Sequence, residues 1–341
     1  MPKMRLLLFL VCGFPLVLSA CGGSAQSADS AVTIGYMNNG SVDPAQASLS
    51  LGLYKKDIHG AVKTVKFDSG PAALTALGSG DVDIMTGIGN PPVASALSNH
   101  VPISVIWAEE LGQTDQALVV KKSTGITSVA GLKGKQVATV VGSTSSYALS
   151  AVLKKNGLSD SDVEVRNMDP NTILTAWSKN QISAAYIWDP VMAKLLADGG
   201  VKLADNTDVQ NVAPIYNFSV VNTQWAASHH NLVVQFIQAQ NDGLKALQSD
   251  QSKTLQAMMK DTGETSQDAH IAVSATKPFD AASQLSPQAL GPDNGHSLAA
   301  TSLLAASKYL HALDPSQSVM TPSGVEIDRS FVKDFLKAGN S

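Results

Sequence analysis

Short β runs alternate with helical segments along the first two thirds of the chain, and this alternation limits the possible folds more than any other feature. The expected strands of the first part are residues 32–36, 64–67, 82–85, 103–107 and 117–120. Segments with apolar residues at helical spacing, at 71–77 and 92–97, lie between them. Strands that alternate with helices predict an α/β fold with a mainly parallel sheet.

The same pattern begins again in a second part of the chain. Its expected strands are residues 135–140, 163–165, 184–188 and 201–203, with helices at 145–156 and 173–178. After a strand expected at 218–221 the chain becomes helical, with amphipathic segments at 232–247 and 298–313. At roughly 100–200 residues per domain, the 341 residues predict about two domains.

The N-terminus predicts an export signal, which we assign to residues 1–20. Lys3 and Arg5 precede an apolar run at 6–18, which is shorter than the about 20 residues of a membrane-spanning helix. The run ends in Leu18-Ser19-Ala20-Cys21, which resembles a lipobox with Cys21 as the lipidated residue. An ordinary signal peptide, cleaved at a small-residue site, is the alternative. Residues 21–30 are rich in Gly, Ser and Ala and predict a flexible tether.

Composition and missing motifs exclude several classes of function. The net charge is −4, and no basic patch marks a nucleic-acid-binding protein. Both cysteines, Cys12 and Cys21, lie in the first 21 residues, so we expect no disulfide, thiolate metal site or cysteine nucleophile in the body. The sequence contains no HExxH, GxSxG or GxxxxGK[ST] motif. We therefore expect a protein without metal, cofactor or enzymatic activity.

An ordered set of motifs resembles one family. Its members, in chain order, are Phe67-Asp68-Ser69-Gly70, residues 73–83, Gly89-Asn90-Pro91-Pro92, residues 116–121, residues 132–138, Ser143-Thr144-Ser145-Ser146-Tyr147, and Ala176-Trp177 with residues 185–190. Together they resemble the substrate-binding lipoproteins of ABC importers for taurine and related sulfonates. That branch also includes nitrate-binding and thiamine-precursor-binding proteins. The resemblance covers residues 32–221 well and the helical tail loosely.

The resemblance implies a two-lobed periplasmic-binding-protein fold with two crossovers and a ligand cleft between the lobes. We expect lobe one at 31–117 plus 218–338 and lobe two at 118–217. It implies an extracytoplasmic receptor that binds taurine or another small alkanesulfonate and delivers it to ABC permease subunits with a cytoplasmic ATPase. We expect a monomer that contacts the periplasmic or extracellular face of the cell membrane only through the lipid on Cys21. A receptor for another small anion or a thiamine precursor, or a ligand sensor, are alternatives in the same fold.

The anionic end of such a ligand suits helix N-termini, which offer free N–H groups and a partial positive charge. Residues 142–146 lie between a strand and a helix, and we expect Ser143, Thr144 and Ser145 to offer N–H groups and hydroxyls there. Two similar strand-to-helix junctions add the candidates Asp68, Ser69, Gly70 and Asn90. Each of these polar residues could instead be only a helix cap.

The cationic end of the ligand needs acceptors. The candidates are Glu109 or Glu110, Asp189 beside the aromatic face of Trp188, and Asn217. Because Glu109 and Glu110 end an expected strand, we expect one side chain in the cleft and the other in solvent. Asp189 could instead form a turn or a helix cap. In the taurine-binding family an acidic residue lies near the second crossover, where this chain has the neutral Asn217.

Two further loop residues complete the predicted site. Asn38 follows the first strand and could face the ligand, although Asn and Gly there also suit a simple turn. Gln113 follows the fourth strand and could reach into the cleft from the first crossover.

Overall fold

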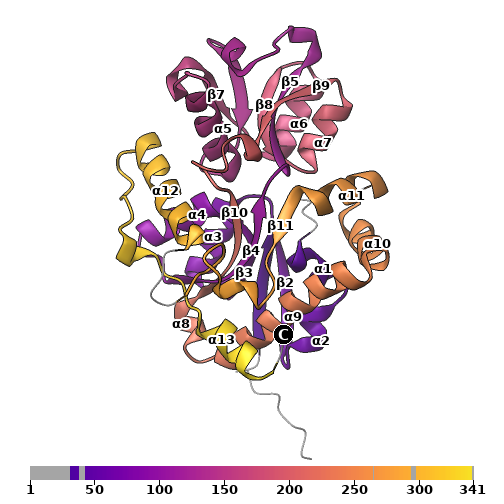
Figure 1. The fold of residues 1–341 in the computed structure, drawn as a ribbon, viewed down its shortest axis with the longest axis vertical. Helices are drawn as coiled ribbons and strands as arrows, with labels where there is room; N and C mark the ends of the chain where they lie inside the picture. The colour runs from indigo at the N-terminus through magenta and orange to yellow at the C-terminus, as the bar shows by residue number, and fades with distance from the viewer. Residues whose placement is uncertain (1–30, 38–42, 264, 293–296, 340–341) are drawn as a thin grey trace, which may run out of the picture.

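Two β-sheets, each flanked by helices, form the two lobes of this computed structural model (Figure 1). The structure describes residues 31–37, 43–263, 265–292 and 297–339. The signal peptide and tether predicted at 1–30, Cys21 and Asn38 lie outside the described residues. The two sheets, with the chain crossing between them twice, confirm the predicted two-lobed α/β fold.

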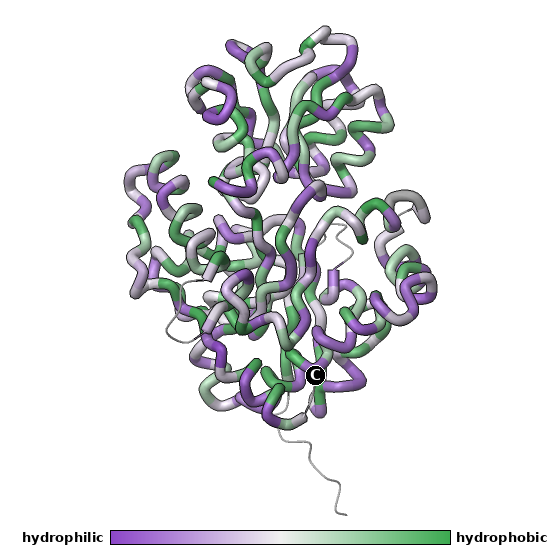
Figure 2. Tube along the Cα trace, viewed as in Figure 1, coloured by the Kyte–Doolittle hydropathy of each residue, from purple (hydrophilic) through white to green (hydrophobic). Residues whose placement is uncertain are grey.

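The first lobe contains a six-stranded sheet in the order β11-β4-β10-β3-β1-β2. Its strands are β1 (Ala31–Met37), β2 (Ala61–Phe67), β3 (Ile84–Gly89), β4 (Ile103–Gly112), β10 (Tyr216–Asn222) and β11 (Thr276–Pro278). The helices between these strands are α1 (Pro44–Ser50), α2 (Leu53–Asp57), α3 (Gly70–Ser79) and α4 (Asn90–Ser98). Apolar residues dominate the central strands because helices cover the sheet, as the green central segments show (Figure 2).

The second lobe contains a five-stranded sheet in the order β7-β6-β8-β5-β9. Its strands are β5 (Gln116–Lys121), β6 (Gln136–Thr139), β7 (Glu164–Asn167), β8 (Ala184–Trp188) and β9 (Gly200–Asp205). Its helices are α5 (Thr144–Lys155), α6 (Pro170–Ser178) and α7 (Val191–Ala197). The α5 helix begins where predicted because Ser143 caps it, accepting a bond from the Ser146 N–H.

The prediction of a mainly parallel sheet is wrong. Strand β1 is parallel to β2 and β3, and β6 is parallel to β7 and β8. However, β10 lies between β3 and β4 and is antiparallel to both. Likewise β5 is antiparallel to β8 and β9. Strands β5 and β10 follow a crossover, and a strand that arrives from the other lobe enters its sheet from the opposite end. Strand β11, which is antiparallel to β4, comes instead from the C-terminal part of the chain.

The crossovers run slightly earlier than expected. The chain leaves the first sheet at Gly112, enters the second at Gln116 and rejoins the first at Tyr216. The lobe boundaries expected after residues 117 and 217 therefore fall within β5 and β10.

The C-terminal part packs around the first sheet (Figure 1). Its helices are α8 (Thr223–Ala226), α9 (His230–Ser249), α10 (Gln251–Thr262), α11 (Ser266–Ala275), α12 (Leu298–Leu313) and α13 (Ser330–Lys337). The buried face of α9 includes Phe236, which stacks on Tyr54 with ring centroids 5.4 Å apart. In the part of the chain that the structure describes, no helix is long and apolar enough to cross a membrane.

Candidate ligand-binding site

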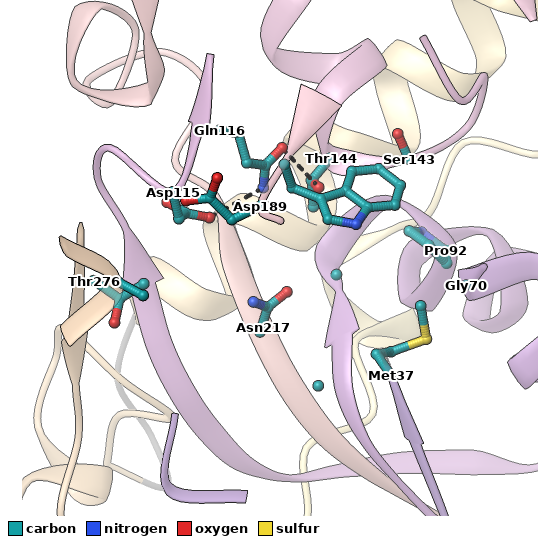
Figure 3. A pocket seen from close by; sticks show the side chains of 14 residues that line it. Met37, Gly70, Pro92, Asp115, Gln116, Ser143, Thr144, Asp189, Asn217 and Thr276 are labelled. Carbon is teal, nitrogen blue, oxygen red and sulfur yellow. Dashed lines mark hydrogen bonds between the residues drawn. The ribbon is translucent and has the colours of Figure 1, made fainter. Parts of the chain in front are cut away.

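A pocket lies between the lobes, at the edge where strands of both sheets end or begin (Figure 3). Its lining residues are Met37, Gly70, Gly87, Gly89, Pro92, Asp115, Gln116, Ser143, Thr144, Trp188, Asp189, Asn217, Ala272 and Thr276. Strand ends of this kind are where open α/β sheets bind ligands. The pocket offers a volume of about 50 Å³ to the centres of water-sized molecules. Because one water needs roughly 10–15 Å³ of such volume, the pocket holds about four water-sized groups. The pocket therefore suits a ligand of few non-hydrogen atoms.

Three helix N-termini converge on one side of the pocket. Gly70 is the first residue of α3, Gly89 directly precedes α4, and Ser143 directly precedes α5. The first N–H groups of a helix have no intrahelical acceptor. Within the described residues the N–H groups of Thr144 and Ser145 have no hydrogen-bond acceptor. Together with the positive ends of three helix dipoles, they suit an anionic group.

The hydroxyls at the start of α5 are already engaged as donors. Ser143 Oγ donates to the Val140 carbonyl over 2.6 Å. Thr144 Oγ1 and Ser145 Oγ donate to Gln116 Oε1 over 3.1 and 2.8 Å. This arrangement differs from the expectation that hydroxyls as well as N–H groups face the anion. The backbone N–H groups are the donors that remain.

Two carboxyl groups line the other side of the pocket. In Figure 3, Asp115 and Asp189 lie together, whereas Ser143, Gly70 and Pro92 lie across the pocket from them. None of the described lining residues is Lys, Arg or His. A pocket with this distribution of charge suits a ligand that is anionic at one end and cationic at the other.

Asp115 is 9% exposed and is held by two amide side chains. Its Oδ1 accepts from Asn206 Nδ2 over 3.2 Å, and its Oδ2 accepts from Gln116 Nε2 over 3.3 Å. Burial raises the pKa of Asp115 to about 6. A carboxylate has about four acceptor sites, so Asp115 can accept further N–H groups from a ligand.

Asp189 combines the two roles considered from the sequence. Its Oδ1 accepts from the Ala193 N–H over 3.0 Å near the start of α7, as a helix cap would. The same residue lines the pocket, next to Trp188 at the end of β8. Its backbone N–H donates to the Asp115 carbonyl over 3.2 Å, which ties the two acidic residues together.

Gln116 connects the acidic side of the pocket to the start of α5. Its Nε2 donates to Asp115 while its Oε1 accepts from Thr144 and Ser145, as the dashed lines in Figure 3 show for Asp115 and Thr144. One side chain therefore sets the distance between the proposed acceptors for a cation and the proposed donors for an anion.

The expectation for the two consecutive glutamates is wrong. Glu109 and Glu110 are both fully buried, and neither lines the pocket. They do not end β4, which continues to Gly112. The register between β4 and β10 shifts at Glu109, and the two glutamates accept from Ser219 and Asn217, two residues apart on β10. Burial raises the pKa of both carboxyl groups.

Each glutamate instead holds a neighbour that lines the pocket. Glu109 Oε1 accepts from the Gly87 N–H over 2.9 Å, and also from Ser219 Oγ and Thr86 Oγ1. Glu110 Oε1 accepts from Asn217 Nδ2 over 2.8 Å.

The structure brings six of the predicted residues into the pocket: Gly70, Ser143, Thr144, Trp188, Asp189 and Asn217. Ser145 is fully buried and bonded to Gln116. Asp68 is exposed, Ser69 and Gln113 are partly exposed, and none of these three lines the pocket.

Asn90 has a structural position. Its Nδ2 donates to the Pro214 carbonyl over 3.1 Å, and its Oδ1 accepts from the Tyr216 N–H over 3.4 Å. The side chain is fully buried and joins α4 to the start of β10, away from the pocket lining.

Sequence reasoning missed eight lining residues: Met37, Gly87, Gly89, Pro92, Asp115, Gln116, Ala272 and Thr276. Asp115 and Gln116 were recognisable as polar residues placed directly before a buried strand. Ala272 and Thr276 gave no such signal, since they come from the tail. There the Ala275 carbonyl accepts from the Gln113 and Thr114 N–H groups over 3.0 Å, which fixes the crossover before Asp115.

Known proteins similar to this chain agree with the predicted resemblance. The chain is 38% identical over 213 residues to the taurine-binding periplasmic protein of Escherichia coli K12, covering 62% of this chain and 64% of that protein. It is 29% identical over 214 residues to a putative aliphatic sulfonates-binding protein of the same organism, covering 62% and 66%. The chain thus spans less than two thirds of the length of these relatives.

A solved structure and a family model complete the comparison. The alkanesulfonate-binding protein SsuA of Xanthomonas axonopodis pv. citri, bound to MOPS, has the same fold, with a TM-score of 0.71 at 21% identity over 88% of this chain and 98% of that one. These matches confirm the resemblance to substrate-binding proteins for taurine and other sulfonates. The family model for the substrate binding domain of ABC-type glycine betaine transport systems matches residues 30–273, and the chain belongs to this family.

Proposed function

We propose that the protein is the receptor of an ABC importer and binds taurine, a small zwitterion, between its lobes. The observation that carries the proposal is the charge distribution of the pocket. Asp115 and Asp189 lie on one side, three helix N-termini lie on the other, and the described lining holds no cationic side chain. The 38% identity to a taurine-binding protein supports the same ligand.

Each end of taurine has a matching set of groups. The sulfonate accepts hydrogen bonds from the N–H groups of Thr144 and Ser145 at the start of α5. The ammonium donates to Asp115 and Asp189, beside the indole of Trp188. Ethanesulfonate has no ammonium that can donate to Asp115 and Asp189, so we expect it to bind more weakly.

A quaternary ammonium ligand fits the pocket less well. Such ligands are recognised by aromatic cages. Trp188 is the one aromatic side chain among the described lining residues. The carboxyl groups of Asp115 and Asp189 favour an ammonium that can donate N–H bonds.

The protein binds its ligand without making or breaking a bond. None of the described lining residues is Cys or His, and the lining hydroxyls of Ser143 and Thr144 donate to Val140 and Gln116. The partners are ABC permease subunits with a cytoplasmic ATPase. The protein is exported and monomeric, and the lipid on Cys21 anchors it to the membrane.

Calorimetric titration tests the proposed ligand. The protein is unfolded and refolded to remove any carried ligand, then titrated with taurine, ethanesulfonate and glycine betaine. We expect taurine to bind at least about tenfold more tightly than ethanesulfonate, a difference of about 1.4 kcal/mol. The variants D115N and D189N should lose this preference, and the exposed control D198N should keep it. Equal affinity for the two sulfonates, or no binding of taurine, would overturn the proposal.

A further inference from the structure

Two tyrosine rings from different lobes lie against each other. Tyr147 is in α5 of the second lobe, and Tyr309 is in α12, which packs on α4 of the first lobe. Figure 1 shows α12 extending from the first lobe toward α5. The two ring centroids are 5.2 Å apart, and the ring planes are tilted by 48°. Aromatic rings with centroids about 4.5–7 Å apart attract each other beyond the effect of burial.

Both rings are buried, although they lie at the boundary between the lobes. Tyr147 is 5% exposed and Tyr309 is 8% exposed. They belong to one continuous hydrophobic cluster, which also contains Leu149 of the second lobe and Leu303 of the first. The other core residues of the second lobe, such as Trp177, form a separate cluster. The ring contact is therefore part of an apolar connection between α5 and the first lobe.

The two hydroxyl groups have different surroundings. The Tyr147 hydroxyl is buried and has no hydrogen-bond partner in the part of the chain that the structure describes. Burial raises the pKa of Tyr147 to about 12. Burial also raises the pKa of Tyr309, and the nearby side chain of Ser146 opposes this rise. Because separation of the lobes would expose the Tyr147 hydroxyl to water, this hydroxyl disfavours the contact that the rings favour.

The ring contact lies close to the anion side of the pocket without being part of it. Tyr147 follows Thr144 by three residues, which is less than one turn of α5. Neither Tyr147 nor Tyr309 lines the pocket. The other two helices that begin at the pocket, α3 and α4, belong to the first lobe. The anion side is therefore complete only while the start of α5 is held against the first lobe.

We propose that Tyr309 is a positioning residue: through Tyr147 it holds the start of α5 against the first lobe, and so sets the fraction of molecules whose anion site is complete. The inference rests on the proposed function for the ligands used to test it. A protein whose binding-competent conformation is only partly populated binds with an affinity reduced by that fraction. Loss of the ring contact therefore weakens the binding of every ligand of the pocket by the same factor.

Three variants and one control test this role. Y309A removes the ring of the first lobe, Y147A removes the ring of the second, and the double variant removes both. L303A truncates another buried residue of α12 and controls for the packing of that helix. Affinities for taurine and ethanesulfonate are measured by calorimetry, and folding is checked by thermal unfolding.

We expect Y309A to lower both affinities about tenfold and to leave their ratio unchanged. Y147A should do the same, and the double variant should lose no more than either single variant, because all three lack the same contact. L303A should lower the melting temperature without this loss of affinity. Unchanged affinities in a folded Y309A, or a changed ratio, would overturn the proposal. If Y309A does not fold, Y147A decides by the same criteria.

A conservative variant separates the ring from its hydroxyl. Y147F keeps the ring contact and removes the buried hydroxyl that has no partner. We expect it to bind taurine at least as tightly as the unmodified protein, since the contact remains and an unfavourable group is gone. Weaker binding by Y147F would contradict a role for the rings.

A ligand-free measurement distinguishes this inference from the proposed function. Small-angle X-ray scattering of the ligand-free proteins should give a larger radius of gyration for Y309A and Y147A than for the unmodified protein and L303A. Equal radii would overturn the role of the contact. If the unmodified protein binds neither sulfonate, the proposed function fails, but the radii still decide whether Tyr309 holds the lobes together.

Discussion

Gly89 of the first lobe lies against Thr144 of the second. A Cβ atom on Gly89 would be 2.4 Å from Thr144 Cγ2, a distance that atoms in contact do not reach. Gly89 ends β3 and Thr144 begins α5. The lobes therefore meet at a point where a side chain has no room, directly beside the pocket.

This contact predicts that G89A keeps the lobes from closing fully. The φ angle of Gly89 is −68°, which alanine adopts readily, so the fold itself should tolerate the change. We expect taurine affinity to fall about tenfold, with a larger radius of gyration for the ligand-saturated protein in small-angle X-ray scattering.

A second substitution provides the matched control for G89A. T144S removes Cγ2 but keeps the hydroxyl that bonds Gln116. The double variant G89A/T144S should therefore recover most of the lost affinity. Unchanged affinity in G89A, or no recovery in the double variant, would show that this contact does not limit closure.

Taurine affinity should depend on the ionisation of Asp115. Burial raises the pKa of this carboxyl group to about 6, and only the ionised form pairs with an ammonium. The affinity should therefore rise about tenfold between about pH 5 and pH 7. Calorimetry at a series of pH values measures this, and D115N should show a flat profile. A pH-independent affinity in the unmodified protein would mean that Asp115 does not bind the cation.

The same group predicts a pH dependence of stability without ligand. The pKa of Asp115 is raised from 3.8 in the unfolded chain to about 6 in the folded one. The unfolding free energy that the protonated Asp115 contributes is therefore fully present below about pH 4, and it is lost as the pH rises through about 6. The loss is about 3 kcal/mol. Urea unfolding should show that the unmodified protein loses more stability than D115N between these limits, and equal losses would contradict this account.

Removing the amide of Gln116 should destabilise the second lobe. In Q116L the buried hydroxyls of Thr144 and Ser145 lose their acceptor, and Asp115 loses a donor. At about 1 kcal/mol for each hydrogen bond, the loss should be about 3 kcal/mol of unfolding free energy. Urea unfolding measures it, with Q181L as a control at an exposed glutamine. A loss no larger than that of Q181L would show that the three bonds contribute little.

Local patterns in the sequence predicted the junctions that form the anion side of the pocket. Ser143 directly precedes α5 and Gly70 is the first residue of α3, so both lie at strand-to-helix junctions. Both were expected to face a ligand. Such junctions are readable because capping residues and prolines act within one helical turn. The helices α9 and α12 were also expected from their apolar spacing, and Trp107 and Trp177 are fully buried in the two cores.

The acidic side was harder to predict because it depends on contacts between distant segments. Asn90 looked like Ser143 in sequence, yet its amide bonds Pro214 and Tyr216 at the second crossover. Glu109 and Glu110 looked like strand-end residues, yet β4 continues past them because β10 and β11 pair along both of its edges. No pattern near these residues indicates those partners.

The α/β alternation, the helix starts and the membership of the family could be read from the sequence, because they depend on local spacing and on residues that the relatives share. Which residues face the pocket together depends instead on how distant segments pack. Insertion of β10 between β3 and β4 places Asn217 between Gly89 and Glu110. The return of the tail as β11 adds Thr276. Strand order and register depend on pairing between segments far apart in the chain, which neither hydrophobic periodicity nor capping encodes.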